Sequence, residues 1–138
     1  MRLKAALRRE LVQAASKAMP LEACGLVGGQ GDELLSFVEC RNAAQSARRY
    51  SISPEDVLSA LRQFERQTVE LRAIFHSHPA GDARPSATDI REAMYPDVAH
   101  LIVGRPPDLE LRAFWIEAGL VREERLEVTD GRHEREME

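Results

Sequence analysis

The stretch HSHPAGDARPSATD, residues 76–89, contains the end of a strand, a loop and the start of a helix. The run before it, ELRAIFH at residues 70–76, is short and apolar, which predicts a strand. His76 and His78 then lie two positions apart on one face, so their imidazoles can converge on one ion. Pro79 cannot donate to a strand ladder, so the strand should end there and leave both histidines accessible.

The second half of this stretch predicts a helix from Ser86 through Met94, with Asp89 in its first turn. S-x-x-D is a near relative of the capping box, in which the serine accepts from the third helical amide. Taken alone, Ser86 and Asp89 favour capping, and either histidine taken alone is more often structural. The joint pattern of two histidines, proline, serine and aspartate is far rarer by chance. It therefore favours one shared site.

His76, His78 and Asp89 offer three ligands, one short of tetrahedral zinc. This is the ligand count of a catalytic zinc site, where water takes the fourth position. Mixed imidazole and carboxylate ligation suits zinc better than magnesium or calcium, which prefer oxygen alone. Bound zinc lowers the pKa of water from about 15.7 toward about 7, and a carboxylate from elsewhere must take the proton. The pattern predicts a zinc hydrolase.

The pattern H-x-H-P followed by S-x-x-D, together with Glu22 in PLEACGLVGG, resembles the JAMM (MPN+) metalloprotease family. The resemblance implies that Glu22 is the general base and that Ser86 helps to stabilise the tetrahedral oxyanion. It also implies that the zinc ligands are His76, His78 and Asp89. The likeness covers roughly residues 14–116, including RNAAQSARRYSISPEDVL, and is greatest to the short bacterial and archaeal members. The long insertions with which eukaryotic deubiquitinases of this family hold ubiquitin are missing.

This resemblance implies a zinc metallopeptidase or isopeptidase that cleaves an amide bond after the C-terminal Gly-Gly of a ubiquitin-like or sulfur-carrier protein. Because Gly-Gly has no Cβ, an extended tail could thread a narrow groove beside the metal. Two alternatives stay open. One is a non-catalytic MPN-type module that only binds proteins. The other is a zinc amidohydrolase with a small or RadC-like target, since RadC-like proteins have a similar arrangement.

The composition of the 138 residues indicates one globular domain, with 30% charged and 43% hydrophobic residues. A net charge of -4 argues against nucleic acid as a partner, because such proteins carry a basic face. The N-terminal run MRLKAALRRELVQ is interrupted by charges, so it predicts neither a signal peptide nor a membrane span. We therefore expect a cytoplasmic protein without a membrane partner. The sequence leaves its oligomeric state open.

Cys24 and Cys40 are the two cysteines. If residues 28–32, GGQGD, form the turn of a hairpin, Cys24 lies opposite about Phe37 and Cys40 opposite Leu21. The two backbones would then be roughly 10 Å apart along the strands, which is beyond the reach of a disulfide. Both thiols are therefore predicted to be reduced.

Periodicity and turn signals predict the remaining elements. Helices are expected at residues 3–18 and from 54 onward, the latter capped by Ser53; strands are expected at 21–27, 33–40, 98–103, 109–116 and 120–128. His100 is interpreted as a satisfied structural histidine rather than an extra ligand. Arg48 and Arg49 are interpreted as part of a solvated loop rather than a substrate contact.

These elements predict an α/β fold, a single domain in which two or three helices flank a curved mixed β-sheet. The family resemblance implies that this sheet is of the MPN or cytidine-deaminase-like type. We expect the domain to occupy residues 1–128. Residues 129–138 are charge-dense and are expected to form a disordered tail.

Overall fold

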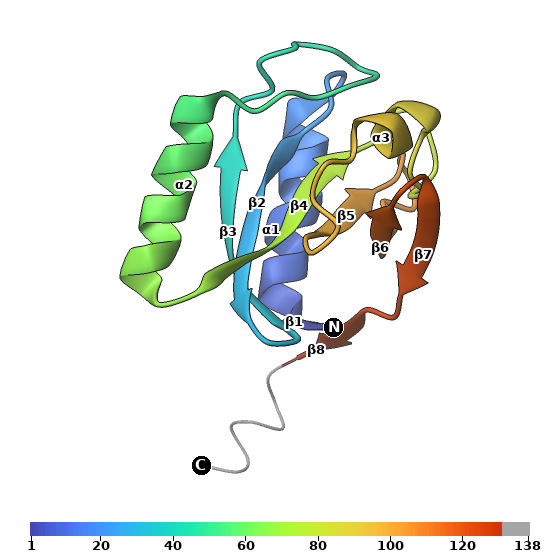
Figure 1. The fold of residues 1–138 in the computed structure, drawn as a ribbon. Coiled ribbons are helices and arrows are strands. Elements are labelled where there is room, and N and C mark those ends of the chain that lie inside the picture. The colour runs from blue at the N-terminus through green and yellow to red at the C-terminus, as the bar shows by residue number, and fades with distance from the viewer. Residues whose placement is uncertain (131–138) are drawn as a thin grey trace.

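An eight-stranded mixed sheet carries the fold of residues 1–130, the part of the chain that the computed structural model describes (Figure 1). Its strand order is β7-β6-β5-β4-β2-β3-β1-β8. The pairs β4–β5, β1–β3 and β1–β8 are parallel, and the other pairs are antiparallel. The elements in chain order are β1 (Arg2–Lys4), α1 (Ala5–Ala18), β2 (Cys24–Gln30), β3 (Glu33–Cys40), α2 (Pro54–Gln67), β4 (Glu70–Ser77), α3 (Ala87–Glu92), β5 (Ala99–Val103), β6 (Leu111–Glu117), β7 (Leu120–Glu124) and β8 (Glu127–Thr129).

The two long helices cover opposite faces of the sheet (Figure 1). On one face, Leu7 and Leu11 of α1 belong to the larger apolar core together with Phe75 of β4. On the other face, Phe64 of α2 packs in a smaller cluster with Leu26 of β2. All five residues of β5 are buried, as the continuous apolar run predicted for a strand covered on both sides. The predicted mixed sheet flanked by helices is therefore confirmed.

The sheet curls until its two edges come close together. β7 and β8 lie at opposite ends of the strand order, yet only Arg125 and Leu126 connect them. A link of this length spans roughly 10 Å. The prediction of one edge strand at 120–128 is therefore wrong, because β7, which pairs with β6, ends at Glu124, and the chain then forms β8, which pairs with β1 on the other edge. The same pairing involves Arg2–Lys4, which form β1, so the first helix begins at Ala5, two residues later than predicted.

The predicted hairpin register between β2 and β3 is also wrong. Cys24 lies directly opposite Cys40, because β2 continues through Gly29 to Gln30 and the turn is only two residues long. Glycine is needed in this strand, since a Cβ at Gly29 would overlap the carbonyl oxygen of Glu33. β2 correspondingly begins three residues later than predicted. Both thiols are nevertheless free, as predicted.

Two further elements agree with the sequence. β3 has the predicted bounds, and Ser53 caps α2 by accepting a hydrogen bond from the Asp56 amide at 3.1 Å, with Pro54 as the first helical residue. α3 is shorter than predicted and ends at Glu92. Of the predicted tail, Thr129 still belongs to β8, and residues 131–138 lie outside the described part of the chain.

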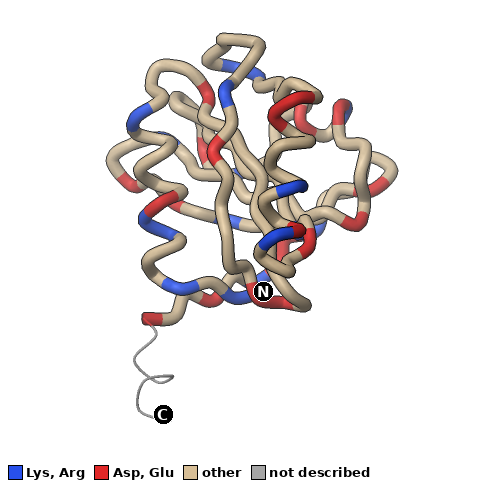
Figure 2. Tube along the Cα trace, turned by 90° about the vertical axis from the view of Figure 1, so that its left-hand side faces the viewer, with Lys and Arg blue, Asp and Glu red and all other residues tan. Residues whose placement is uncertain are grey.

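Among residues 1–130, none of the helices is long and apolar enough to cross a membrane. In Figure 2, basic and acidic positions are interspersed along the trace rather than gathered by sign.

Candidate metal centre

The predicted ligands lie where β4 ends and α3 begins. His76 is the penultimate residue of β4, and His78 follows the strand directly. β4 runs parallel to β5, and the loop that carries α3 connects them, so the carboxyl ends of both strands meet at this edge. Ligand sites in sheets with parallel strands commonly occupy this position. The Ser77 hydroxyl also accepts a hydrogen bond from the Ala23 amide at 2.8 Å, which ties the segment carrying Glu22 to β4.

One carboxylate oxygen of Asp89 contacts both imidazoles. The distances from Asp89 Oδ2 are 3.1 Å to Nε2 of His76 and 3.0 Å to Nε2 of His78. Two ligands of a tetrahedral zinc ion are about 3.3 Å apart, given metal–ligand bonds of about 2.0 Å. Both distances from Asp89 Oδ2 are therefore slightly shorter than the spacing that the ion requires, and a small expansion would reach it.

His78 has a hydrogen-bond acceptor at each ring nitrogen. Its Nδ1 lies 2.8 Å from the carbonyl oxygen of Asp82, and its Nε2 faces the Asp89 carboxylate. A neutral imidazole has only one N–H, so a proton or a metal ion must stand between the second nitrogen and its acceptor. Burial lowers the pKa of His78, but the bonds to Asp89 and to the Asp82 carbonyl outweigh this, and the pKa is raised.

A metal ion would resolve this conflict at His78. The Asp82 carbonyl holds the proton on Nδ1, which leaves Nε2 as the ligand atom. Burial raises the pKa of Asp89, but hydrogen bonds from His76 and His78 more than offset this and lower it, so the carboxylate is ionised. In His76 complete burial lowers the pKa, which favours the neutral ring that a metal requires. The donor set fits zinc.

Glu22 reaches the same place from the segment before β2. Its ligand atom lies within 4.8 Å of those of His76 and His78, and its side chain is 2% exposed. Its Oε1 atom is buried without a hydrogen-bond partner. Burial raises the pKa of Glu22 from 4.5 to about 7, with smaller opposite effects of His78, which lowers it, and Asp89, which raises it. A carboxylate with this pKa can accept and return a proton near neutral pH.

Ser86 forms a complete capping box with Asp89. Its hydroxyl oxygen accepts from the Asp89 amide at 3.1 Å, and its own amide donates to Asp89 Oδ2 at 2.8 Å. Because the Ser86 hydroxyl acts only as an acceptor in this motif, its proton is left to donate elsewhere. The capping and catalytic interpretations of Ser86 are therefore compatible.

Two residues that the sequence did not single out border this centre. The Tyr50 ring stacks on the His76 ring, with centroids 4.6 Å apart and an interplanar angle of 22°. Asn42 is buried beneath the loop that carries Tyr50. Both lie in a polar run without periodicity, so no pattern marked them. In the same run Arg49 pairs with Glu92 at 3.6 Å, whereas Arg48 is exposed.

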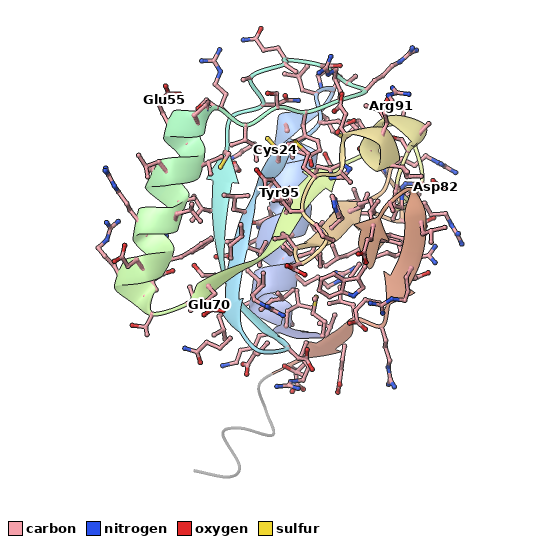
Figure 3. All side chains as sticks on the ribbon, in the orientation of Figure 1. Cys24, Glu55, Glu70, Asp82, Arg91 and Tyr95 are labelled. Carbon is pink, nitrogen blue, oxygen red and sulfur yellow. The ribbon has the colours of Figure 1, made fainter. Side chains whose placement is uncertain are left out.

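An apolar groove of about 490 Å³ begins at Asp89 and runs between α2 and the segment after α3. Tyr95, from the segment after α3, lies over the sheet between α2 and α3 (Figure 3). Its apolar lining includes Ile52, Val57, Leu61, Ile74, Met94, Tyr95 and Val98. His100 also lines the groove and does not join the metal-ligand group of the described residues. Burial lowers its pKa to about 4, and its Nδ1 has no partner, so the prediction of a satisfied histidine is wrong.

A family model described as prokaryotic homologs of the JAB domain matches residues 4–117. That range contains both long helices, all the residues of the metal centre and the groove. The chain belongs to this JAB-domain family. The resemblance inferred from the sequence is therefore confirmed.

Relatives of this JAB-domain chain are named as a peptidase, a protease and a desampylase. It is 32% identical over 132 residues to the CysO-cysteine peptidase of Mycobacterium tuberculosis, an alignment that covers 93% of this chain and 90% of the relative. It is 37% identical over 101 residues to a probable TtuB-protein conjugate cleaving protease of Thermus thermophilus, covering 72% and 65%. A desampylase of Haloferax volcanii is 34% identical over 86 residues, covering 60% and 62%.

Solved structures of other chains have the same JAB-domain fold. A protein of Desulfitobacterium hafniense superimposes with a TM-score of 0.86 at 32% identity, covering 94% of this chain and 92% of that one. A JAB1/MPN domain protein of Archaeoglobus fulgidus gives a TM-score of 0.64 at 21% identity, covering 94% and 99%. The second likeness concerns the fold alone, and it agrees with the predicted MPN-type sheet.

Proposed function

We propose that this protein is a zinc-dependent metallopeptidase that hydrolyses an amide or isopeptide bond. The observation that supports it most is the position of Glu22, an unpartnered buried carboxyl within 4.8 Å of two imidazoles that already share a carboxylate. Such a buried set is costly to the fold unless a cation and a polar substrate complete it. Relatives named as peptidases support the same activity.

In this proposal, His76, His78 and Asp89 hold the zinc ion. Bound zinc supplies a Lewis acid that polarises a carbonyl and makes water a nucleophile near neutral pH. Glu22 takes the proton of the attacking water and returns it to the leaving amine, which its pKa of about 7 permits in both directions. Ser86 donates its free hydroxyl proton to the carbonyl oxygen as negative charge develops there.

The substrate class follows from the surroundings of the centre. We propose a ubiquitin-like or sulfur-carrier protein that ends in Gly-Gly, joined to a protein or to an amino acid. The relatives from Mycobacterium tuberculosis and Thermus thermophilus are named for CysO-cysteine and for TtuB conjugates. Because Gly-Gly has no side chains, selectivity must come from residues before it, and the apolar groove that begins at Asp89 offers them a surface.

The direct test uses zinc-loaded protein and a panel of small carriers from the same host, each with Gly-Gly followed by a C-terminal extension. Mass spectrometry is expected to detect release of the extension directly after Gly-Gly. A control panel carries Val-Val in place of Gly-Gly. If the protein cleaves a simple peptide amide but none of the carriers, the proposed hydrolase activity stands and the proposed substrate class is wrong.

The two alternatives make different predictions. A non-catalytic binding module has no need of a full ligand set, so purified protein would contain no zinc, whereas the enzyme is expected to contain one equivalent. A zinc amidohydrolase with a RadC-like target would favour nucleic-acid partners, which a net charge of -4 opposes. We expect the protein to act in the cytoplasm.

Ser86→Ala is expected to lower kcat by about 100-fold, because one oxyanion donor is lost. Zinc content should stay at one equivalent, since Ser86 is not a ligand. Loss of the cap also costs about 1 kcal/mol of stability, so activity is measured per folded molecule. Ser86→Thr, which keeps both the cap and the hydroxyl, is the control and should retain most activity. Equal activity of the alanine and threonine variants would limit Ser86 to capping.

A further inference from the structure

The buried side chain of Asn42 makes five hydrogen bonds. Its Nδ2 group, which has two N–H donors, lies 3.1 Å from the carbonyl oxygen of Glu22, 3.3 Å from that of Ser46 and 3.0 Å from that of Arg49, so one N–H is shared between two carbonyls. Its Oδ1 atom accepts from the amides of Ala44 at 3.0 Å and Ser51 at 3.1 Å. The amide is 8% exposed. The segment between β3 and α2 forms neither strand nor helix, so this one side chain satisfies main-chain groups that regular structure would otherwise pair.

Two of these bonds hold the peptide groups on either side of Tyr50. Asn42 donates to the carbonyl of Arg49 and accepts from the amide of Ser51. Tyr50 itself stacks on His76 at 4.6 Å, as described above. The stacked ring therefore has its backbone fixed on both sides by Asn42.

A third bond holds the segment of the general base. Asn42 donates to the carbonyl of Glu22, and the amide of Glu22 donates to the carbonyl of Ser46 at 2.9 Å. Ser46 is in turn bound by Asn42. The main chain of Glu22 is thus fixed at both its amide and its carbonyl, although Glu22 precedes the first residue of β2. In Figure 1 the segment between β3 and α2 arches over this end of the sheet.

We infer that Asn42 is a positioning residue of the metal centre, which sets Glu22 and the Tyr50 ring relative to His76. The inference rests on the proposed function for its kinetic consequence but not for its structural one. The Asn42 side chain bonds main-chain groups and is not one of the proposed ligands. Its effect is geometric: a base displaced by about 1 Å can lose about 100-fold in rate.

The kinetic experiment compares zinc-loaded Asn42→Ala with the full-length parent on the Gly-Gly carrier that the parent cleaves. We expect kcat to fall by about 100-fold while KM changes by less than threefold, because most of the residues that line the groove, Tyr50 and Ile52 excepted, come from segments that Asn42 does not bond. The matched control is Leu7→Ala, which destabilises the core near the start of α1, on the sheet face opposite α2. At equal folded fraction Leu7→Ala should keep kcat. If Asn42→Ala also keeps it, the inference is wrong.

A second variant separates the acceptor from the donor bonds. Asn42→Asp keeps the two bonds that Oδ1 accepts, but it turns a carboxylate oxygen toward three carbonyl oxygens. We expect its kcat to be at least as low as that of Asn42→Ala. If the alanine variant does not fold, Asn42→Ser is measured instead, because its hydroxyl can still bond one carbonyl. An unchanged kcat of this variant would likewise contradict the inference.

A structural readout needs no substrate. In the zinc-free protein, the Tyr50 ring should shift the ring-proton resonances of His76 upfield, and Tyr50→Leu defines the unshifted position. Asn42→Ala is expected to move these resonances most of the way to that position, whereas Leu7→Ala should leave them unchanged. An unchanged spectrum of Asn42→Ala would overturn the inference. If no carrier is cleaved by the parent, the proposed function fails while this measurement still decides the role of Asn42.

Discussion

Glu22→Gln is expected to lower kcat by about 10³-fold while the protein retains one equivalent of zinc. The amide keeps the size of the carboxyl but cannot take a proton, and general-base catalysis contributes about 10² to 10⁴ in rate. The measurement pairs turnover on a Gly-Gly carrier with metal analysis of the same sample. Glu70→Gln, an exposed carboxyl at the opposite end of β4 (Figure 3), is the control and should keep full activity. Near-normal turnover of Glu22→Gln would mean that the base is elsewhere.

The same substitution should stabilise the zinc-free protein at alkaline pH. The pKa of Glu22 is raised from 4.5 to about 7 on folding, so its burial is harmless below about pH 4.5; its cost grows as the pH rises from about 4.5 to about 7 and stays constant above that. Above that pH the buried charge costs up to about 3 kcal/mol. Glutamine carries no charge, so the Tm of Glu22→Gln should exceed that of the parent at pH 8 by several degrees, and the difference should largely vanish at pH 5. A constant difference across this range would contradict the assigned pKa.

Asp89→Asn is expected to abolish both zinc binding and activity. The amide can still accept the Ser86 N–H bond that begins α3, but it offers no charge to a metal and only one acceptor oxygen. Zinc content should fall from one equivalent to below about 0.1. The rise in Tm that zinc gives the parent should also disappear, a stabilisation of about 2.7 kcal/mol when free zinc is 100 times Kd.

Asp82→Asn provides the matched control for this substitution. Asp82 lies in the same loop, and its side chain is exposed beside α3 (Figure 3). Only its main-chain carbonyl takes part in the centre, through His78. This variant should bind zinc and turn over as the parent does. Retained zinc in Asp89→Asn would show that the two histidines are completed by Glu22 instead.

The residues at the metal centre differ in how far the sequence revealed them. His76, His78, Ser86 and Asp89 lie close together in the chain, and a strand end followed by a capped helix start converges by local geometry alone. Glu22 is distant in sequence, and only the family resemblance connected it to the others. Its approach depends on tertiary hydrogen bonds, such as that between Ala23 and Ser77, which no local pattern encodes.

The incorrect predictions arise from long-range pairing. The predicted hairpin register was wrong because glycines usually mark turns. Gly28 and Gly29 instead lie within β2, where neighbouring atoms leave no room for a Cβ. The prediction of a single last strand was wrong because the apolar pattern does not show that residues 127–129 pair with β1 rather than with β6. Asn42 was passed over because a single polar residue in a loop carries no period that would distinguish it from a solvated one.

The two-residue link between β7 and β8 has a practical consequence for any shortened form of this protein. β8 lies parallel to β1, and the amide of Glu127 donates to the carbonyl of Met1 at 2.9 Å. A chain clipped before residue 127 would uncover the outer side of β1, with its row of unpaired peptide groups. Exposed strand edges of this kind recruit other chains. The three residues of β8 thus pair with β1 and keep it from becoming the edge strand of the sheet.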